Sequence, residues 1–109
     1  MSGRVTFTVG SGNVFADLGL PDAEERLAKA ELAHRIYRLV EERGWEDART
    51  AAEFGIDPAE ASALLGGRLA GFSIGRLFHL LNALDQDIEI VVRPNRSGNR
   101  PAGLTVAAD

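Results

Sequence analysis

The sequence contains no cysteine, which excludes disulfide bridges, cysteine nucleophiles and thiolate metal ligands. Long apolar runs are absent too, and no stretch approaches the roughly 20 residues of a transmembrane helix. The start of the chain, Met1 to Arg4, leads into no apolar segment followed by a small-residue cleavage site, so no signal peptide is predicted. These absences predict a soluble, cytoplasmic protein that makes no contact with a membrane.

An excess of positive charge is also missing. The chain has 12 basic and 16 acidic residues, and its net charge of −4 is the wrong sign for non-specific binding to nucleic acid. The most acidic segment is 46–72, where five acidic residues stand against Arg49 and Arg68 and the net charge is −3. A nucleic-acid-binding surface there would have to depend on a few arginines.

Residue patterns for catalysis and metal binding are absent as well. The two histidines, His34 and His79, each fall on a predicted helix away from its apolar stripe, which is typical of solvated side chains. No group of His, Asp and Glu has the spacing of metal ligands, and no serine stands in a nucleophile motif. The sequence therefore predicts no enzyme, no catalytic residue, no cofactor, no metal and no small-molecule substrate.

At 109 residues the chain is expected to form one domain with two extensions. Residues 1–20 form an N-terminal arm, in which alternation from Val5 to Val9 predicts a short strand. Residues 21–94 form a helical domain that ends in a strand of branched residues, which Pro94 terminates. Residues 95–109 are rich in glycine, proline and asparagine and are predicted to be a mobile tail.

Capping residues mark the first and last helices of the domain. Asp22 opens a helix that is expected to run to about Arg43 and to end at Gly44. Ser73 caps a later helix with an apolar stripe of Ile74, Leu77, Phe78, Leu81 and Leu84.

Between them, two short helices have the spacing of a helix-turn-helix unit from Glu46 to Gly66. The first lies near residues 47–54 and stops at Gly55, where a positive φ is expected. The second opens with Asp57 as N-cap, Pro58 at the first helical position and Glu60 as capping-box partner. The residues expected to face inward are Ala51, Phe54, Ile56, Ala61 and Leu64. Any two short amphipathic helices joined by glycine look similar, but the complete spacing favours the helix-turn-helix.

Several runs of the sequence resemble small Cro/CI-type (XRE-type) regulators, a group whose members are commonly HigA-like antitoxins. The similarity covers residues 10–94 and is carried by Gly12-Asn13-Val14-Phe15-Ala16-Asp17-Leu18-Gly19, Leu64-Leu65-Gly66-Gly67-Arg68-Leu69 and Leu80-Leu81-Asn82-Ala83-Leu84. The resemblance implies a mainly α, lambda-repressor-like domain of four to five helices with a short N-terminal and a C-terminal strand. It further implies a homodimer that binds double-stranded operator DNA, represses its own operon and, where paired with a toxin protein, neutralises it.

The expected DNA-contacting positions depart from the pattern of that group. Glu46 and Asp47 stand where such proteins usually have threonine and glutamine, and the second helix presents no Arg, Lys, Asn or Gln to read base edges. The residues expected to contact DNA are Arg49, Ala59, Glu60, Ser62, Ala63, Arg68 and Arg76. Two alternatives follow: weak DNA binding supported by a dimer or partner, or a protein–protein interaction module with little sequence-specific DNA binding.

The C-terminal strand predicts the interface of a homodimer. A lone strand leaves its backbone groups unpaired, so this one requires a neighbour. Either its copy in a second subunit or the strand from Val5 to Val9 could supply that neighbour. The interface residues are expected to be Ile88, Ile90 and Val92.

Overall fold

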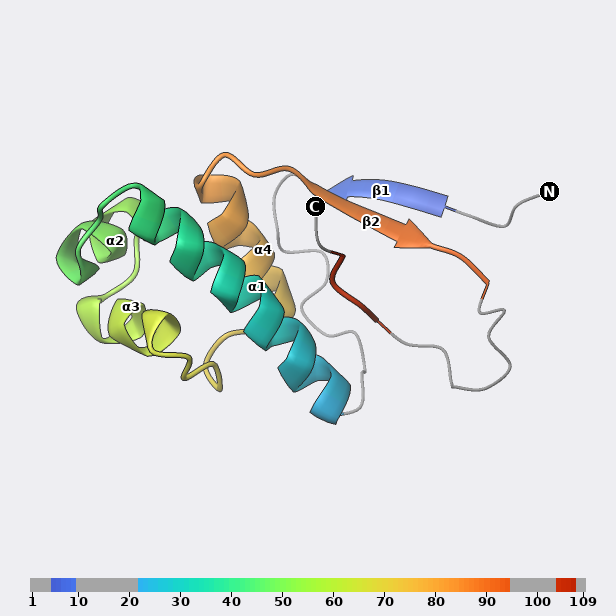
Figure 1. The fold of residues 1–109 in the computed structure, drawn as a ribbon, viewed down its shortest axis with the longest axis horizontal. Coiled ribbons are helices and arrows are strands. Elements are labelled where there is room, and N and C mark those ends of the chain that lie inside the picture. The colour runs from blue at the N-terminus through green and yellow to red at the C-terminus, as the bar shows by residue number, and fades with distance from the viewer. Residues whose placement is uncertain (1–4, 10–21, 95–103, 108–109) are drawn as a thin grey trace.

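Four helices form the body of the protein in the part of the chain that the structure describes. The computed structural model describes residues 5–9, 22–94 and 104–107. Helices α1 (Asp22–Glu42), α2 (Asp47–Phe54), α3 (Pro58–Leu65) and α4 (Ile74–Ala83) precede one C-terminal strand, β2 (Ile88–Val92), as Figure 1 shows. The fold is mainly α, as predicted, and the four helices begin and end within a residue or two of the positions expected from the caps.

The hydrophobic core lies between α1 and α4 and is closed by α3. α1 packs mainly on α4, and α2 packs mainly on α3. Figure 1 shows α1 running across α4, with α2 and α3 together at one end of the molecule. The largest apolar side chains that are at most 2% exposed are Ile36, Leu64, Leu77, Leu80 and Leu84. Burying one such side chain contributes about 1.5–3 kcal/mol, so these positions fix how the helices pack.

Strand β2 pairs antiparallel with β1 (Val5–Val9) in a two-stranded sheet. Val5 lies opposite Val92, and Val9 lies opposite Ile88. Ile88 is half-buried against the core, whereas Val92 is 50% exposed. In a two-stranded sheet each strand keeps a second edge with unpaired backbone groups. Within residues 5–9, 22–94 and 104–107, β1 is the one strand that pairs with β2.

Residues 104–107 lie against α1 rather than forming part of a free tail. Leu104 and Val106 are half-buried against the core. The Leu104 N–H donates to the Glu24 carboxylate, and the Arg35 guanidinium donates to the Ala107 carbonyl. Two apolar and two polar contacts thus hold these four residues of the predicted 95–109 tail on the helix. Residues 95–103 and 108–109 of that predicted tail, and most of the predicted arm, lie outside the described residues.

Candidate functional site

Helices α2 and α3 form the predicted helix-turn-helix unit. Gly55 closes α2 in the left-handed region, at φ 68° and ψ 33°, and its N–H donates to the carbonyls of Ala51 and Ala52. The Ile56 N–H then donates to the Ala51 carbonyl at 3.0 Å, and the Ile56 side chain is half-buried. Ala51 is 4% exposed and Ala61 is fully buried. Small side chains at these two positions let the helices approach closely across a tight turn.

The start of α3 is fixed by its own residues. The Glu60 N–H donates to Asp57 Oδ1 at 2.8 Å, and Glu60 Oε1 accepts from the Asp57 N–H at 3.4 Å. Pro58 occupies the first turn. This is the capping box predicted from the sequence. The positive end of the helix dipole also stabilises the negative charge of its two carboxylates. The acidic character of α3 therefore has a structural cause.

The outer face of α3 is smaller than expected. Ala59 and Ser62 are exposed, and Glu60 is half-buried. Ala63, which we expected to face outward, is instead half-buried and packs against the core. The turn after α3 brings Arg68 close to Ala63, and the Arg68 N–H donates to the Ala63 carbonyl at 2.8 Å. The exposed surface of α3 consequently consists of Pro58, Ala59 and Ser62, with the half-buried Glu60 carboxylate beside them.

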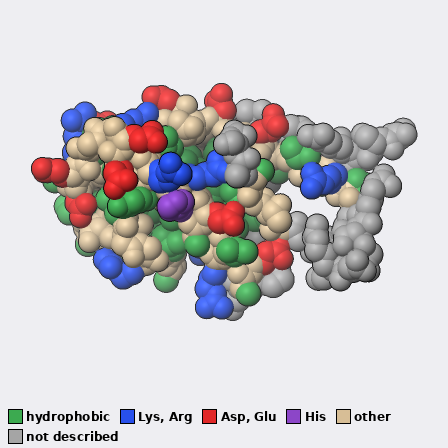
Figure 2. All heavy atoms as spheres, in the orientation of Figure 1, with side chains coloured by type: hydrophobic (Ala, Val, Ile, Leu, Met, Phe, Trp, Pro, Cys, Tyr) green, Lys and Arg blue, Asp and Glu red, His purple; other side chains and the backbone are tan. Residues whose placement is uncertain are grey.

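The structure places each of the three predicted arginines beside an acceptor near the helix-turn-helix unit. Arg49 Nε lies 2.9 Å from the Glu53 carboxylate, one turn further along α2. Arg76 Nη2, on α4, lies 2.7 Å from Glu60 Oε2. Figure 2 shows blue and red side chains interleaved on the visible face of the helical body, with no single basic patch there. Arg49 and Arg76 are thus each paired with a carboxylate.

Arg68 lies in the turn after α3, where its guanidinium reaches back along the helix. Its Nη2 donates to Ser62 Oγ at 3.5 Å, a long hydrogen bond between two exposed side chains. The same guanidinium lies close to Gly66, where an added Cβ would meet Arg68 Nη1 at 2.9 Å. Arg68 therefore lies beside the exposed side of α3, where its hydrogen-bond partner is the neutral Ser62 side chain.

A cluster around Trp45 adds one arginine that sequence reasoning missed. The half-buried Trp45 ring packs edge-on to Phe54, with 6.3 Å between the ring centroids. The Arg43 and Arg49 guanidinium carbons lie 5.3 and 5.4 Å from the centre of the Trp45 ring, within the range of cation–π attraction. Arg43 also donates to the Leu84 carbonyl at 3.1 Å, a contact across 41 residues that no local pattern reveals.

The N-terminus of α2 carries the two acidic residues that depart from the pattern of the regulators. Glu46 and Asp47 are exposed, and the Glu46 side chain makes no capping hydrogen bond. The Glu46 carbonyl instead accepts from the hydroxyl of Thr50, a fully buried residue, at 3.0 Å. The backbone of Glu46 therefore has a structural role that its carboxylate does not share.

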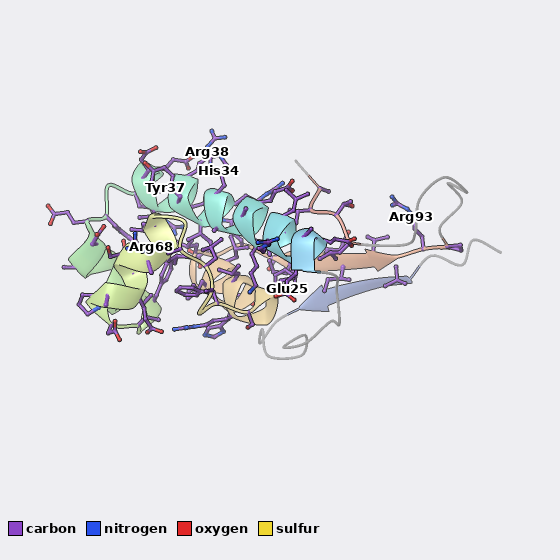
Figure 3. All side chains as sticks on the ribbon, turned by 90° about the horizontal axis from the view of Figure 1, so that it is seen from below. Glu25, His34, Tyr37, Arg38, Arg68 and Arg93 are labelled. Atoms are coloured by element: carbon purple, nitrogen blue, oxygen red, sulfur yellow. The ribbon has the colours of Figure 1, made fainter. Side chains whose placement is uncertain are left out.

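The outer side of α1 carries side chains that the helix-turn-helix does not use. Figure 3 shows His34, Tyr37 and Arg38 projecting from α1, and Arg93 beside the sheet. The Tyr37 hydroxyl donates to Glu41 at 3.0 Å, and this hydrogen bond, together with the charge of Glu41, raises the pKa of Tyr37. Tyr37 and Glu41 are both exposed and lie one helical turn apart, an arrangement that is common on a solvated helix face.

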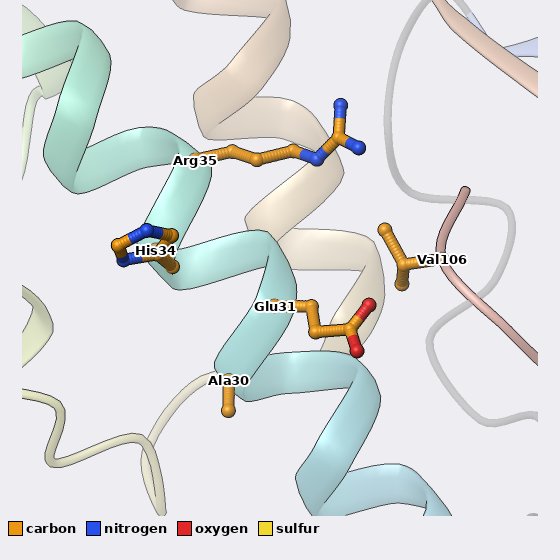
Figure 4. Close-up of a pocket in the computed structure, with 5 residues that line it drawn as sticks. All are labelled: Ala30, Glu31, His34, Arg35 and Val106. Atoms are coloured by element: carbon orange, nitrogen blue, oxygen red, sulfur yellow. The ribbon is translucent and has the colours of Figure 1, made fainter. Parts of the chain in front are cut away.

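A hollow of about 310 Å³ lies between α1 and residues 104–107. Figure 4 shows its lining, which consists of Ala30, Glu31, His34, Arg35 and Val106.

Among the described residues, no group of three or more His, Asp or Glu side chains is placed to hold a metal ion. Within the same residues, no helix has the length and apolar character needed to cross a membrane.

Comparison with known proteins matches most of the chain. A family model described as a helix-turn-helix domain matches residues 14–93, which contain all four helices and β2. One solved structure, named "Putative XRE Family Transcriptional Regulator", is 43% identical and superposes with a TM-score of 0.76. The match covers 82% of this chain and 100% of that one. Among curated proteins, none matches the chain.

Proposed function

This chain belongs to the helix-turn-helix family of XRE-type transcriptional regulators, and from that premise we propose that it binds operator DNA as a homodimer. Regulators of this family are not enzymes, so the chain is assigned no catalytic residue. The observation that carries the proposal is the geometry of α2 and α3: a tight left-handed turn at Gly55, close packing at Ala51 and Ala61, and an exposed α3 beside Arg68.

The residues around α3 suit contacts to the DNA backbone better than contacts to bases. In helix-turn-helix proteins the second helix enters the major groove with its N-terminal residues against base edges. Here Ala59 offers a methyl group and Ser62 a hydroxyl, so direct readout is limited. Arg49, Arg68 and Arg76 supply the phosphate contacts that position the protein. Affinity then comes mainly from phosphate contacts and from the use of two subunits.

The homodimer is proposed to form through the free edge of β2, with Ile88, Ile90 and Val92 at or near the interface. The 50% exposure of Val92 supports this assignment, as does the second edge of β2, which no other strand in the described part of the chain occupies. Light scattering at micromolar concentration tests it: a dimer is expected, and Val92→Arg should weaken the dimer. A wild-type protein that remains monomeric under those conditions would overturn the dimer.

The resemblance to HigA-like antitoxins supports a more specific role: repression of the protein's own operon and neutralisation of a toxin. Co-expression with the product of a small neighbouring gene is the direct test. We expect a stable complex and relief of growth arrest. A neighbouring product that neither binds this chain nor arrests growth would remove the antitoxin role and leave the regulator.

The DNA-contact assignment is tested by fluorescence anisotropy at low salt with a duplex from the protein's own promoter. Arg49→Ala combined with Arg68→Ala removes two proposed phosphate contacts, so the slope of log affinity against log salt should fall by about two. Arg93→Ala is the control for the loss of an arginine elsewhere, because it removes one positive charge beside the sheet, away from α3 (Figure 3). Unchanged affinity in the double variant would remove both arginines from the interface.

A second candidate, a protein–protein interaction module, is favoured by the ion pairs Arg49–Glu53 and Arg76–Glu60. These pairs reduce the positive charge that a DNA interface would present. The same experiment separates the two functions. Absence of binding to any duplex at low salt, together with co-purification of a stable protein partner, would establish the interaction module instead.

A further inference from the structure

We infer that Glu60 acts as a built-in competitor of DNA phosphate for the Arg76 guanidinium, and so sets the affinity of the helix-turn-helix unit for DNA. The inference rests on the proposed DNA-binding function and concerns the regulation of that same surface. It starts from the 2.7 Å ion pair that joins the first turn of α3 to the first turn of α4.

Arg76 is held in position by groups other than Glu60. Its Nη1 donates to the Gly71 carbonyl at 3.2 Å, and its guanidinium carbon lies 4.5 Å from the centre of the buried Phe72 ring. The Arg76 backbone N–H donates to Ser73 Oγ, the N-cap of α4. The guanidinium therefore keeps its place when the Glu60 carboxylate is neutralised, and it remains directed toward the start of α3.

The carboxylate of Glu60 occupies the hydrogen-bonding position that a phosphate oxygen would take. Guanidinium groups bind carboxylate and phosphate with the same fork of N–H donors. Both side chains are about one-third exposed, at 32% for Arg76 and 38% for Glu60, so the pair is within reach of a ligand on the surface. A phosphate that binds Arg76 must displace this carboxylate or accept its negative charge as a close neighbour.

The pair at Arg49 differs from the pair at Arg76. Arg49 and Glu53 are 60% and 42% exposed and belong to one helix, which is the arrangement of a weak, readily exchanged surface pair. Arg76 is fixed between an aromatic ring, a carbonyl and a carboxylate from another helix. The competition is consequently strongest at Arg76.

Glu60 can be neutralised without disturbing the helix start. Glutamine keeps the side-chain carbonyl that accepts from the Asp57 N–H, and a capping box is formed by glutamine as well as by glutamate. Glu60→Gln therefore removes the competing charge while it preserves side-chain size and the cap. Glu31→Gln removes the same charge from the exposed outer side of α1 and serves as the matched control.

The experiment measures fluorescence anisotropy of wild type, Glu60→Gln, Arg76→Ala, the double variant and Glu31→Gln. The probes are a promoter duplex and an unrelated duplex, each at several salt concentrations. Glu60→Gln is expected to tighten binding to both duplexes about three- to tenfold at low salt and to steepen the salt slope by about one, because Arg76 then contacts phosphate without a competing carboxylate. The double variant should lose this gain.

Three results would overturn the inference. If Glu60→Gln tightens DNA binding no more than Glu31→Gln does, the gain in affinity is an effect of net charge. If the gain persists in the double variant, Arg76 is not the group for which Glu60 competes. Weaker binding confined to the promoter duplex would make Glu60 a base-reading residue. Failure of the proposed function looks different, since wild type and all variants would then bind neither duplex.

Discussion

The inner and outer faces of the helix-turn-helix unit follow different physical rules. On the inner face, Ala51, Ala61 and Leu64 are each at most 4% exposed, and each has the size that the space between the helices allows. On the outer face, Ala59 and Ser62 are exposed, Glu60 is paired with Arg76, and the Arg68 guanidinium donates to Ser62. Packing therefore constrains the inner residues closely, whereas charge and solvent constrain the outer ones only loosely.

This difference separates the fold from its use. A helix-turn-helix is preserved as long as its inner volumes, its turn and its caps are preserved, whatever the outer face carries. The outer face alone determines how DNA is bound, and here it combines small side chains with paired charges. Fold and DNA recognition can therefore be broken independently, and the following substitutions, ordered by expected effect, do so.

Leu64→Ala should give the largest effect because it breaks the inner face. Leu64 is 1% exposed at the junction of α3 with the core, and truncating such a leucine costs about 2–5 kcal/mol through lost burial and the cavity left behind. Chemical denaturation monitored by circular dichroism measures the loss. DNA binding should disappear together with the fold.

Ser62→Ala is the matched control on the outer face of the same helix. It should change the free energy of unfolding by less than about 0.5 kcal/mol, because an exposed serine contributes little to packing. Equal destabilisation by the two substitutions would show that the two faces do not differ as the burial indicates.

The sequence predicted the inner face well because its signals are local. Gly55 marks a turn, Asp57 with Glu60 marks a helix start, and Ala51 lies one turn before the glycine, all within a short stretch of chain. Helical periodicity likewise predicted which side of α4 is buried. These features depend on backbone geometry and the hydrophobic effect, which act over a few residues.

Contacts between distant segments could not be predicted in this way. The Glu60–Arg76 pair spans 16 residues, and the Arg43 contact to the Leu84 carbonyl spans 41. The packing of residues 104–107 on α1 was missed because glycine and proline in the preceding segment indicated a tail. Which charges meet depends on how the helices cross, and that is known only once the core is assembled.

Gly55→Ala should give an intermediate effect because it alters the turn without altering either face. An added Cβ at Gly55 would meet no atom within 4 Å, so the cost is the backbone strain of a left-handed alanine, about 1–2 kcal/mol. Gly71→Ala is the control: its Cβ also enters open space, but its φ is not positive, and stability should be unchanged or slightly higher. Thermal unfolding of both variants measures the difference, and equal melting temperatures would contradict a strained turn.

Glu41→Gln should give the smallest effect on stability, since it changes an exposed contact on the outer side of α1. The hydrogen bond and the charge of Glu41 raise the pKa of Tyr37, because both favour the neutral phenol. A raised pKa in the folded state means that this contribution is complete below the ordinary tyrosine pKa and is lost as the pH rises through the raised value. Tyr37 is the single tyrosine of the chain, so an ultraviolet titration of phenolate reports on it alone. The variant should titrate at lower pH than wild type, while its melting temperature at neutral pH stays the same. Identical titration of the two proteins would mean that Glu41 does not act on the phenol. A large loss of stability in the variant would mean that exposed contacts contribute more to folding than the difference between the inner and outer faces indicates.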